Sequence, residues 1–148
     1  MPSDHRPVYR RTTLRIREQI DSDGGTVYKL TQKIPVRVPG AQQGFITSMY
    51  LSKAEFDLLV QLPARTLTKT RHRVPPFGVD VFGGTLEGLI LAEAEFDSSA
   101  EAVALVMPPF ALSEVTEDER STGGRLAGAS RRDARAWLAE FGVSLSEI

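Results

Sequence analysis

The sequence contains no cysteine, only two histidines and a single tryptophan among its 148 residues. The absence of cysteine excludes disulfide scaffolds and thiolate metal sites. No apolar run approaches the roughly 20 residues that a membrane-spanning helix needs, and the first residues lack the apolar stretch of a signal peptide. These absences predict one ordinary soluble domain over residues 1–148, located in the cytoplasm.

Positive and negative charges are almost balanced overall, with a net charge of −1, but they are unevenly distributed. Residues 1–75 hold thirteen Lys and Arg against six acids, whereas residues 76–148 hold five Arg against thirteen acids. The small net charge argues against nucleic acid or a membrane surface as a partner. The two halves of opposite sign either meet at one site or form two solvated faces.

The first half of the chain has the patterns of a β-hairpin followed by a strand and a helix. Residues 8–18 and 26–34 alternate in polarity, and the glycine-containing turn 21–25 between them predicts that the two strands pair. Residues 35–44 form an expected loop before a β-prone run at 45–51. Ser52 and Glu55 have the spacing of a capping box, which predicts a helix over 53–62 that ends before Pro63.

The second half has patterns of three further strands and two further helices. Pro75-Pro76 and Gly83-Gly84 predict breaks between the strands, and Gly123-Gly124 predicts the end of a polar acidic turn that starts at Glu114. The expected strands are 66–74, 78–82 and 89–96, and the expected helices are 98–106 and 130–141.

Four of the predicted strands repeat charge of one sign at alternate positions, so that the like charges share a face. Like charges on one strand face repel each other and add little stability in water. A closed or nearly closed sheet would place them around a polar interior that suits a phosphate chain with a hard divalent cation. The alternative is a set of solvated faces with ion pairs worth under about 1 kcal/mol each. The like-charged groups on the four strands are Arg15/Arg17, Lys29/Lys33, Lys69/Arg71/Arg73 and Glu93/Glu95, with Asp80 as a further carboxylate.

In its order of motifs, the sequence resembles the CYTH family, or triphosphate tunnel metalloenzymes, over about residues 9 to 127. That family includes inorganic triphosphatases, thiamine triphosphatases and class IV adenylate cyclases. The matching segments are Leu14-Arg-Ile-Arg17, Tyr28-Lys-Leu-Thr-Gln-Lys33, Lys69-Thr-Arg-His-Arg73, Val79-Asp80-Val-Phe82 with Gly88-Leu89, Ala92-Glu-Ala-Glu95, and Glu114-Val-Thr-Glu-Asp-Glu-Arg120 leading to Arg125-Leu-Ala127.

The resemblance implies an α+β fold: an antiparallel eight-stranded β-tunnel, without its first strand, and with helices packed outside. Residues 8–127 would supply the tunnel strands and intervening helices, and residues 130–142 a C-terminal helix. Glu93, Glu95 and Asp80 resemble catalytic carboxylates that hold Mg²⁺ or Mn²⁺ and orient water. The residues that resemble the phosphate clamp are Arg15, Arg17, Lys29, Lys33, Lys69, Arg71 and Arg73, and Glu114 resembles a residue at the tunnel mouth.

Three departures from the family pattern reduce the supply of carboxylates. The chain has no E-x-E-x-K strand before Leu14, no R-x-E-x-E in residues 45–51, and Gly78 where the family often has glutamate. Because a hard cation takes about six oxygen ligands, fewer carboxylates should weaken metal binding. A late gene start could explain the missing strand. Alternatively, the truncation is natural and leaves a sheet edge free to pair with another chain, for example in a homodimer.

Three functions fit these residues. The first is hydrolysis of a phosphoanhydride bond in inorganic triphosphate, polyphosphate or a nucleoside triphosphate, and the second is binding of such a ligand without turnover. The third is the cyclisation of ATP on the same scaffold. No nucleophile–base system accompanies them, because no G-x-S-x-G motif is present and His72 lies on the face opposite Lys69. Trp137 in the last predicted helix is expected to anchor the core.

Overall fold

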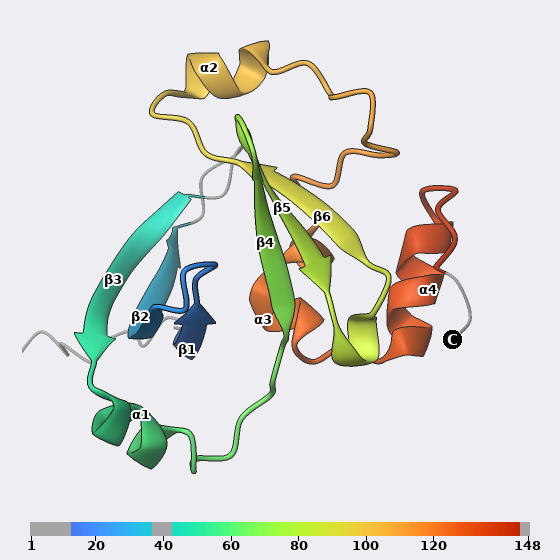
Figure 1. Cartoon of the computed structure of the whole chain (residues 1–148). Coiled ribbons are helices and arrows are strands. Elements are labelled where there is room, and N and C mark those ends of the chain that lie inside the picture. The colour runs from blue at the N-terminus through green and yellow to red at the C-terminus, as the bar shows by residue number, and fades with distance from the viewer. Residues whose placement is uncertain (1–12, 37–42, 146–148) are drawn as a thin grey trace, which may run out of the picture. The chain divides into compact units, whose positions relative to one another are not determined.

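The computed structural model describes residues 13–36 and 43–145, and it is α+β in these ranges (Figure 1). The chain divides into two compact units, unit 1 (Met1–Ala64) and unit 2 (Arg65–Ile148). Each unit contains one antiparallel three-stranded sheet. In the described ranges, every helix is too short or too polar to cross a bilayer.

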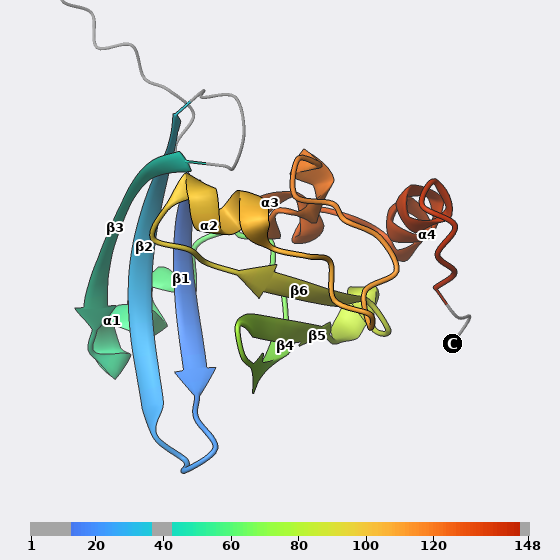
Figure 2. The same ribbon diagram turned by 90° about the horizontal axis from the view of Figure 1, so that it is seen from above.

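Unit 1 is a sheet of three consecutive strands, β1 (Thr13–Ile20), β2 (Thr26–Val36) and β3 (Gln43–Leu51), which lie side by side in that order (Figure 2). The predicted hairpin is confirmed, because β1 pairs antiparallel with β2 from Thr13↔Lys33 to Ile20↔Thr26. Gly24 adopts a φ of +86° in its turn, a conformation that glycine tolerates and other residues rarely adopt. Residues 8–12 of the first predicted strand lie outside the described residues.

Helix α1 (Lys53–Leu59) follows β3 directly and begins where the sequence predicts. The hydroxyl of Ser52 accepts from the Glu55 backbone N–H, and the Glu55 carboxylate accepts from the Ser52 backbone N–H at 2.7 Å. The helix ends three residues before the predicted end at 62. Phe56 packs its ring against Tyr28 of β2 at 4.8 Å between centroids, which fixes α1 against one face of the sheet.

The register of unit 1 separates an apolar face from a basic face. Leu30 of β2 lies opposite Ile16 of β1 and Met49 of β3, so these three residues share the apolar face. Lys29 lies opposite Arg17 and Tyr50, so they share the other face. The alternation predicted for the first two strands is therefore present in β1 and β2, and β3 continues the same two faces.

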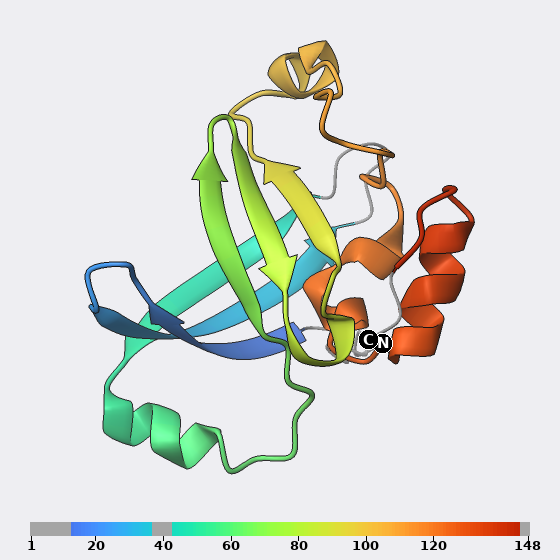
Figure 3. The same ribbon diagram turned by 45° about the vertical axis from the view of Figure 1, so that its right-hand side comes forward.

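Unit 2 contains the strands β4 (Lys69–Val74), β5 (Phe77–Phe82) and β6 (Ile90–Ala94), again adjacent in chain order (Figure 3). Pro75 and Pro76 form the two-residue connection between β4 and β5, as predicted. A short 3₁₀ helix, Gly84–Leu86, joins β5 to β6. Strand β6 is shorter than the predicted 89–96, so Glu95 lies just beyond its end.

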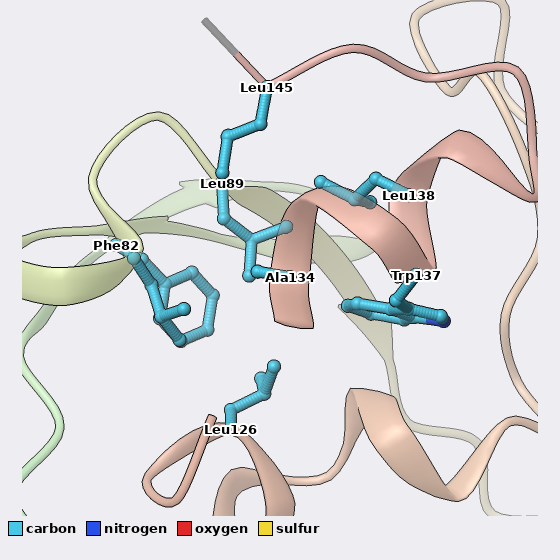
Figure 4. Packing of buried hydrophobic residues seen from close by; sticks show 8 residues of the cluster. Phe82, Leu89, Leu126, Ala134, Trp137, Leu138 and Leu145 are labelled. Atoms are coloured by element: carbon cyan, nitrogen blue, oxygen red, sulfur yellow. The ribbon is translucent and has the colours of Figure 1, made fainter. Parts of the chain in front are cut away.

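The remaining helices of unit 2 follow the sheet in sequence. They are α2 (Ser99–Ala104), a 3₁₀ turn (Glu119–Ser121), α3 (Gly123–Leu126) and α4 (Arg131–Ala139). Figure 4 shows the core that α3 and α4 form with the end of the sheet, where Phe82, Leu89, Leu126 and Trp137 are all buried. Trp137 is therefore confirmed as a core anchor, with only 4% of its surface exposed.

The predicted eight-stranded tunnel is not confirmed, because the described residues form six strands in two sheets and no closed barrel. One physical reason lies in the segment between α2 and the acidic turn. Pro108 and Pro109 lack the N–H groups that a strand would donate to a neighbour, and Pro108–Phe110 forms a turn in which Ala111 donates to the Pro108 carbonyl at 3.0 Å. The description of residues 1–148 as a single domain stays a prediction.

The core of unit 2 lies partly on the charged face of its sheet. Phe82 of the core and Leu91, which packs against it, share a face with Asp80. The charged face therefore continues into the core at one end of the sheet. Gly123-Gly124 was expected to end the acidic turn, and helix α3, which was not predicted, begins at Gly123. Leu126, 3% exposed, anchors this helix, so burial outweighs the low helix propensity of glycine.

Candidate functional site

The basic face of unit 1 consists of rows of side chains that run across the three strands. Arg15, Thr31 and Ser48 form one row, and Arg17, Lys29 and Tyr50 form the next. Lys33 lies in the row beyond Arg15, opposite Ile46. The four predicted clamp residues of this unit, Arg15, Arg17, Lys29 and Lys33, therefore share one face, and none of the paired positions described on it is acidic.

Two contacts within these rows were not predicted from the sequence. The hydroxyl groups of Thr31 and Ser48 lie 2.9 Å apart, and Thr31 is buried at 7% exposure. The Lys29 ammonium lies over the Tyr50 ring, 5.0 Å from its centroid. Hydroxyl and aromatic groups in β3 thus occupy the face that the family resemblance fills with carboxylates.

A buried carboxylate organises the charged face of unit 2. Asp80 on β5 is 4% exposed, and both its oxygens accept hydrogen bonds from β4. Arg71 donates through Nε at 2.7 Å and Nη2 at 2.8 Å, and Lys69 donates to Oδ2. Arg71 Nη2 also reaches Glu93 on β6, at 2.7 Å. The Asp80 carboxylate of β5 therefore holds Lys69 and Arg71 of β4, and Arg71 also contacts Glu93 of β6.

The protonation state of Asp80 follows from these contacts. Burial alone would raise the pKa of the Asp80 carboxyl, because the interior disfavours the charged form. The hydrogen bonds from Arg71 and Lys69 outweigh burial and hold the pKa of Asp80 below its ordinary value. Asp80 is therefore ionised at neutral pH. The hydrogen bond to Asp80 also raises the pKa of Arg71, which keeps the guanidinium charged.

Gly78 allows Arg71 to lie across β5. A Cβ at position 78 would come within 3.1 Å of Arg71 Cδ and 3.2 Å of its Nε. Any side chain there would require the arginine to shift, because such contacts are closer than ordinary packing permits. The glycine that replaces an expected carboxylate thus creates the space in which Arg71 reaches both Asp80 and Glu93.

The metal-binding potential of this region lies at β6. Glu93 has an exposed side chain, and Glu95 is also exposed just beyond the strand. Carboxylates suit a hard cation, so Glu93 and Glu95 fit a site that the oxygens of a bound phosphate chain would complete. Among residues 13–36 and 43–145, however, no three Asp, Glu or His side chains are grouped closely enough to hold a metal ion. Both oxygens of Asp80 accept from Lys69 and Arg71, and its predicted role as a catalytic carboxylate and metal ligand stays a prediction.

The acidic turn is attached to the C-terminal helix. Asp118 accepts from the Arg120 guanidinium, at 2.7 Å from Nη2, and from the indole N–H of Trp137 at 2.9 Å. Arg120 in turn donates to Glu140 at 2.7 Å and 2.9 Å. Glu114 is exposed and accepts from Thr116 at 3.0 Å. The predicted role of Glu114 at a tunnel mouth stays a prediction, while the rest of the turn is fixed to α4.

The Asp118 contacts predict a pH-dependent contribution to stability. Hydrogen bonds, first from the Arg120 side chain and then from its backbone N–H and Trp137, lower the pKa of Asp118 well below its ordinary value of about 3.9. A group with a lowered folded pKa stabilises the fold above its unfolded pKa and loses that effect as the pH falls. In urea unfolding between pH 3 and 7, we expect Asp118→Asn to be less stable than wild type at pH 6, with the gap narrowing below about pH 4. A gap that stays constant with pH would contradict this explanation.

The structure brings the predicted site residues together in two separate sets. Unit 1 places Arg15, Arg17, Lys29 and Lys33 on one face, and unit 2 joins Lys69, Arg71, Asp80 and Glu93 directly. Arg73 lies opposite Gly78, in the same row as Glu93. That the two sets surround one hollow stays a prediction. Thr31, Ser48 and Tyr50 were not among the predicted site residues, although alternation along β2 and β3 places them beside the cations.

Comparison with known proteins identifies the relationship that these charged faces suggested. No known family profile matches the sequence. The inorganic triphosphatase of Nitrosomonas europaea is 34% identical over 123 residues, a match that covers 77% of this chain and 74% of that protein. The chain belongs to the inorganic triphosphatase family. A crystal structure of a hypothetical protein is also 34% identical, with a TM-score of 0.54 over 80% of this chain and 77% of that one.

Proposed function

We propose that this chain is a metal-dependent triphosphatase of the CYTH type, which binds a triphosphate-containing polyanion and hydrolyses a phosphoanhydride bond. The family relationship supports triphosphate hydrolysis. The observation that most supports the proposal is the buried Asp80 carboxylate, which holds Lys69 and Arg71 in fixed positions on one face of β4. Cations held in this way suit a ligand with several negative charges.

Phosphoryl transfer needs little covalent help from a protein, and most of the catalysis comes from positioning and from electrostatic stabilisation. Lys69 and Arg71 are partly exposed, so a phosphate oxygen can reach them while the buried Asp80 carboxylate holds them in place. Because their positions are set before the ligand arrives, they stabilise the charge on the transferring group without a reorganisation cost. Arg15, Arg17, Lys29 and Lys33 would bind further phosphate oxygens.

The proposal includes Mg²⁺ or Mn²⁺ as the metal, with Glu93 and Glu95 as its protein ligands. When bound, such a cation neutralises charge on the phosphate oxygens. The exposed Glu93 side chain accepts from Arg71 Nη2 at 2.7 Å, so this proposed metal ligand is also in direct contact with a proposed phosphate-binding residue. Loss of Glu93 should therefore affect both the metal requirement and the position of Arg71.

A direct test measures phosphate release from inorganic triphosphate, with Mg²⁺ or Mn²⁺, by wild type and by Glu93→Gln. We expect the variant to lose about 100-fold or more of kcat/KM, because one preorganised charged group is removed. Glu87→Gln is the matched control, because Glu87 is also an exposed glutamate of unit 2 and its backbone carbonyl, which the substitution keeps, accepts a hydrogen bond from Arg131 at 2.8 Å. Equal rates in wild type and Glu93→Gln would contradict the assignment.

A binding module without turnover is the second candidate function, favoured by the basic face of unit 1, where the paired residues include no acid. Calorimetry that shows affinity for inorganic triphosphate, together with no phosphate release under any metal, would favour it over the triphosphatase. With ATP as the substrate, chromatography separates orthophosphate from the pyrophosphate and cyclic nucleotide that cyclisation would produce.

A further inference from the structure

Tyr50 is an exposed aromatic residue on a cationic surface. Its side chain lies in the row of Arg17 and Lys29 on the basic face of unit 1, and it is 74% exposed. The other tyrosine of this sheet, Tyr28, is on the apolar face and packs against Phe56. Tyr28 thus contributes to packing, whereas Tyr50 presents most of its ring to solvent.

Lys29 contacts the Tyr50 ring and leaves part of it accessible. The Lys29 ammonium, 5.0 Å from the ring centroid, contacts the ring as a cation–π pair. With the side chain 74% exposed, ring surface remains for a second planar group. Aromatic side chains beside a positively charged groove are a common device for stacking nucleobases, whichever base is present.

The spacing of the row matches a ligand with a base at one end and phosphates at the other. Adjacent strands lie about 4.8 Å apart, so a chain of phosphates that starts beside Tyr50 on β3 meets Lys29 on β2 and then Arg17 on β1. The next row adds Arg15 and the paired hydroxyls of Thr31 and Ser48. Ammonium, guanidinium and hydroxyl groups all donate to phosphate oxygens.

We propose that Tyr50 stacks the base of a nucleoside triphosphate whose phosphates bind Lys29 and Arg17, which makes this residue the determinant for nucleotides over inorganic triphosphate. The inference rests on the proposed function, since it names a substrate class for the same basic face. Stacking tolerates any base, so adenine, guanine and pyrimidine nucleotides all bind, with purines tighter because their rings are larger.

The test measures dissociation constants by calorimetry with Mg²⁺ for two ligands, ATP and inorganic triphosphate. Tyr50→Leu should weaken ATP binding by about 10-fold or more, because stacking is lost, and should leave inorganic triphosphate unchanged. Tyr50→Phe keeps the ring and should bind both ligands as wild type does. Phe45→Leu is the matched control, because Phe45 is an exposed aromatic residue on the opposite face of β3.

A second readout detects stacking directly. In proton NMR spectra, the adenine protons of ATP should shift upfield with wild type and Tyr50→Phe, and the shift should be lost with Tyr50→Leu. Equal weakening of both ligands in Tyr50→Leu, no weakening of either, or no binding of ATP to wild type would overturn the inference. Binding of both ligands without any phosphate release would contradict the triphosphatase proposal alone.

Discussion

Substituting Asp80 with asparagine should lower the free energy of unfolding by about 2–4 kcal/mol. The buried carboxylate is the common acceptor for Lys69 and Arg71, and its loss removes the negative charge between these two cations, although Arg71 keeps its contact with Glu93. Breaking a fully buried ion pair costs about 3–5 kcal/mol, and a smaller loss is expected here because both cations are partly exposed to water. Urea unfolding followed by circular dichroism measures the effect.

Asp57→Asn provides the control for Asp80→Asn. Asp57 also pairs with a lysine, Lys53, at 2.6 Å, but both side chains are exposed on α1. An exposed pair of this kind contributes about 0.5 kcal/mol or less. If the two variants lost the same stability, Asp80 would not be the organising charge of unit 2. We also expect Asp80→Asn to lose phosphate release, since Lys69 and Arg71 would no longer be held.

Substituting Trp137 with alanine should cost about 3–5 kcal/mol of unfolding free energy. The indole is 4% exposed in the core, where Leu126 of α3 and Leu138 of α4 are also buried. Its N–H donates to Asp118. Alanine would leave a cavity and would also release one of the hydrogen bonds that attach the acidic turn to α4. Trp137 is the only tryptophan of the chain, so circular dichroism rather than fluorescence is the measurement.

Trp137→Phe separates packing from hydrogen bonding in this prediction. Phenylalanine keeps much of the ring but cannot donate to Asp118, which still accepts from Arg120. We therefore expect a smaller loss of stability than with alanine. Val103→Ala, at an 87% exposed position on α2, should change stability by less than about 0.5 kcal/mol. A comparable loss in Val103→Ala and Trp137→Ala would contradict the assignment of the core to α3 and α4.

Local patterns in the sequence predicted most of the elements, because they depend on neighbouring residues. The turn at 21–25, the capping box at Ser52 and Glu55, and the break at Pro75-Pro76 all occur as expected. Element ends were less accurate, as in α1 and β6, because the last turn or pair of residues depends on contacts beyond the local sequence. The start of α3 at Gly123 shows the same limit, since the burial of Leu126 has no local signature.

The alternation of side chains also predicted which site residues share a face, but not which of them touch. Lys69, Arg71 and Asp80 were assigned to one interior, and the register between β4 and β5 brings them into direct contact. Alternation within a strand restricts the register only to steps of two residues, because a slip by two residues keeps every side chain on its face. The Arg71–Glu93 contact and the Thr31–Ser48 pair therefore could not be derived. The relation between the two units is not contained in these patterns either.

Gly78 constrains how this protein could have diverged from its relatives. Arg71 occupies the space that a Cβ at position 78 would need, with its Cδ only 3.1 Å from that point. A glutamate introduced at 78 alone would require the Arg71 side chain to shift, and Arg71 is held there by its contacts with Asp80 and Glu93. The residues at positions 71 and 78 are therefore coupled, and we expect them to vary together among related sequences.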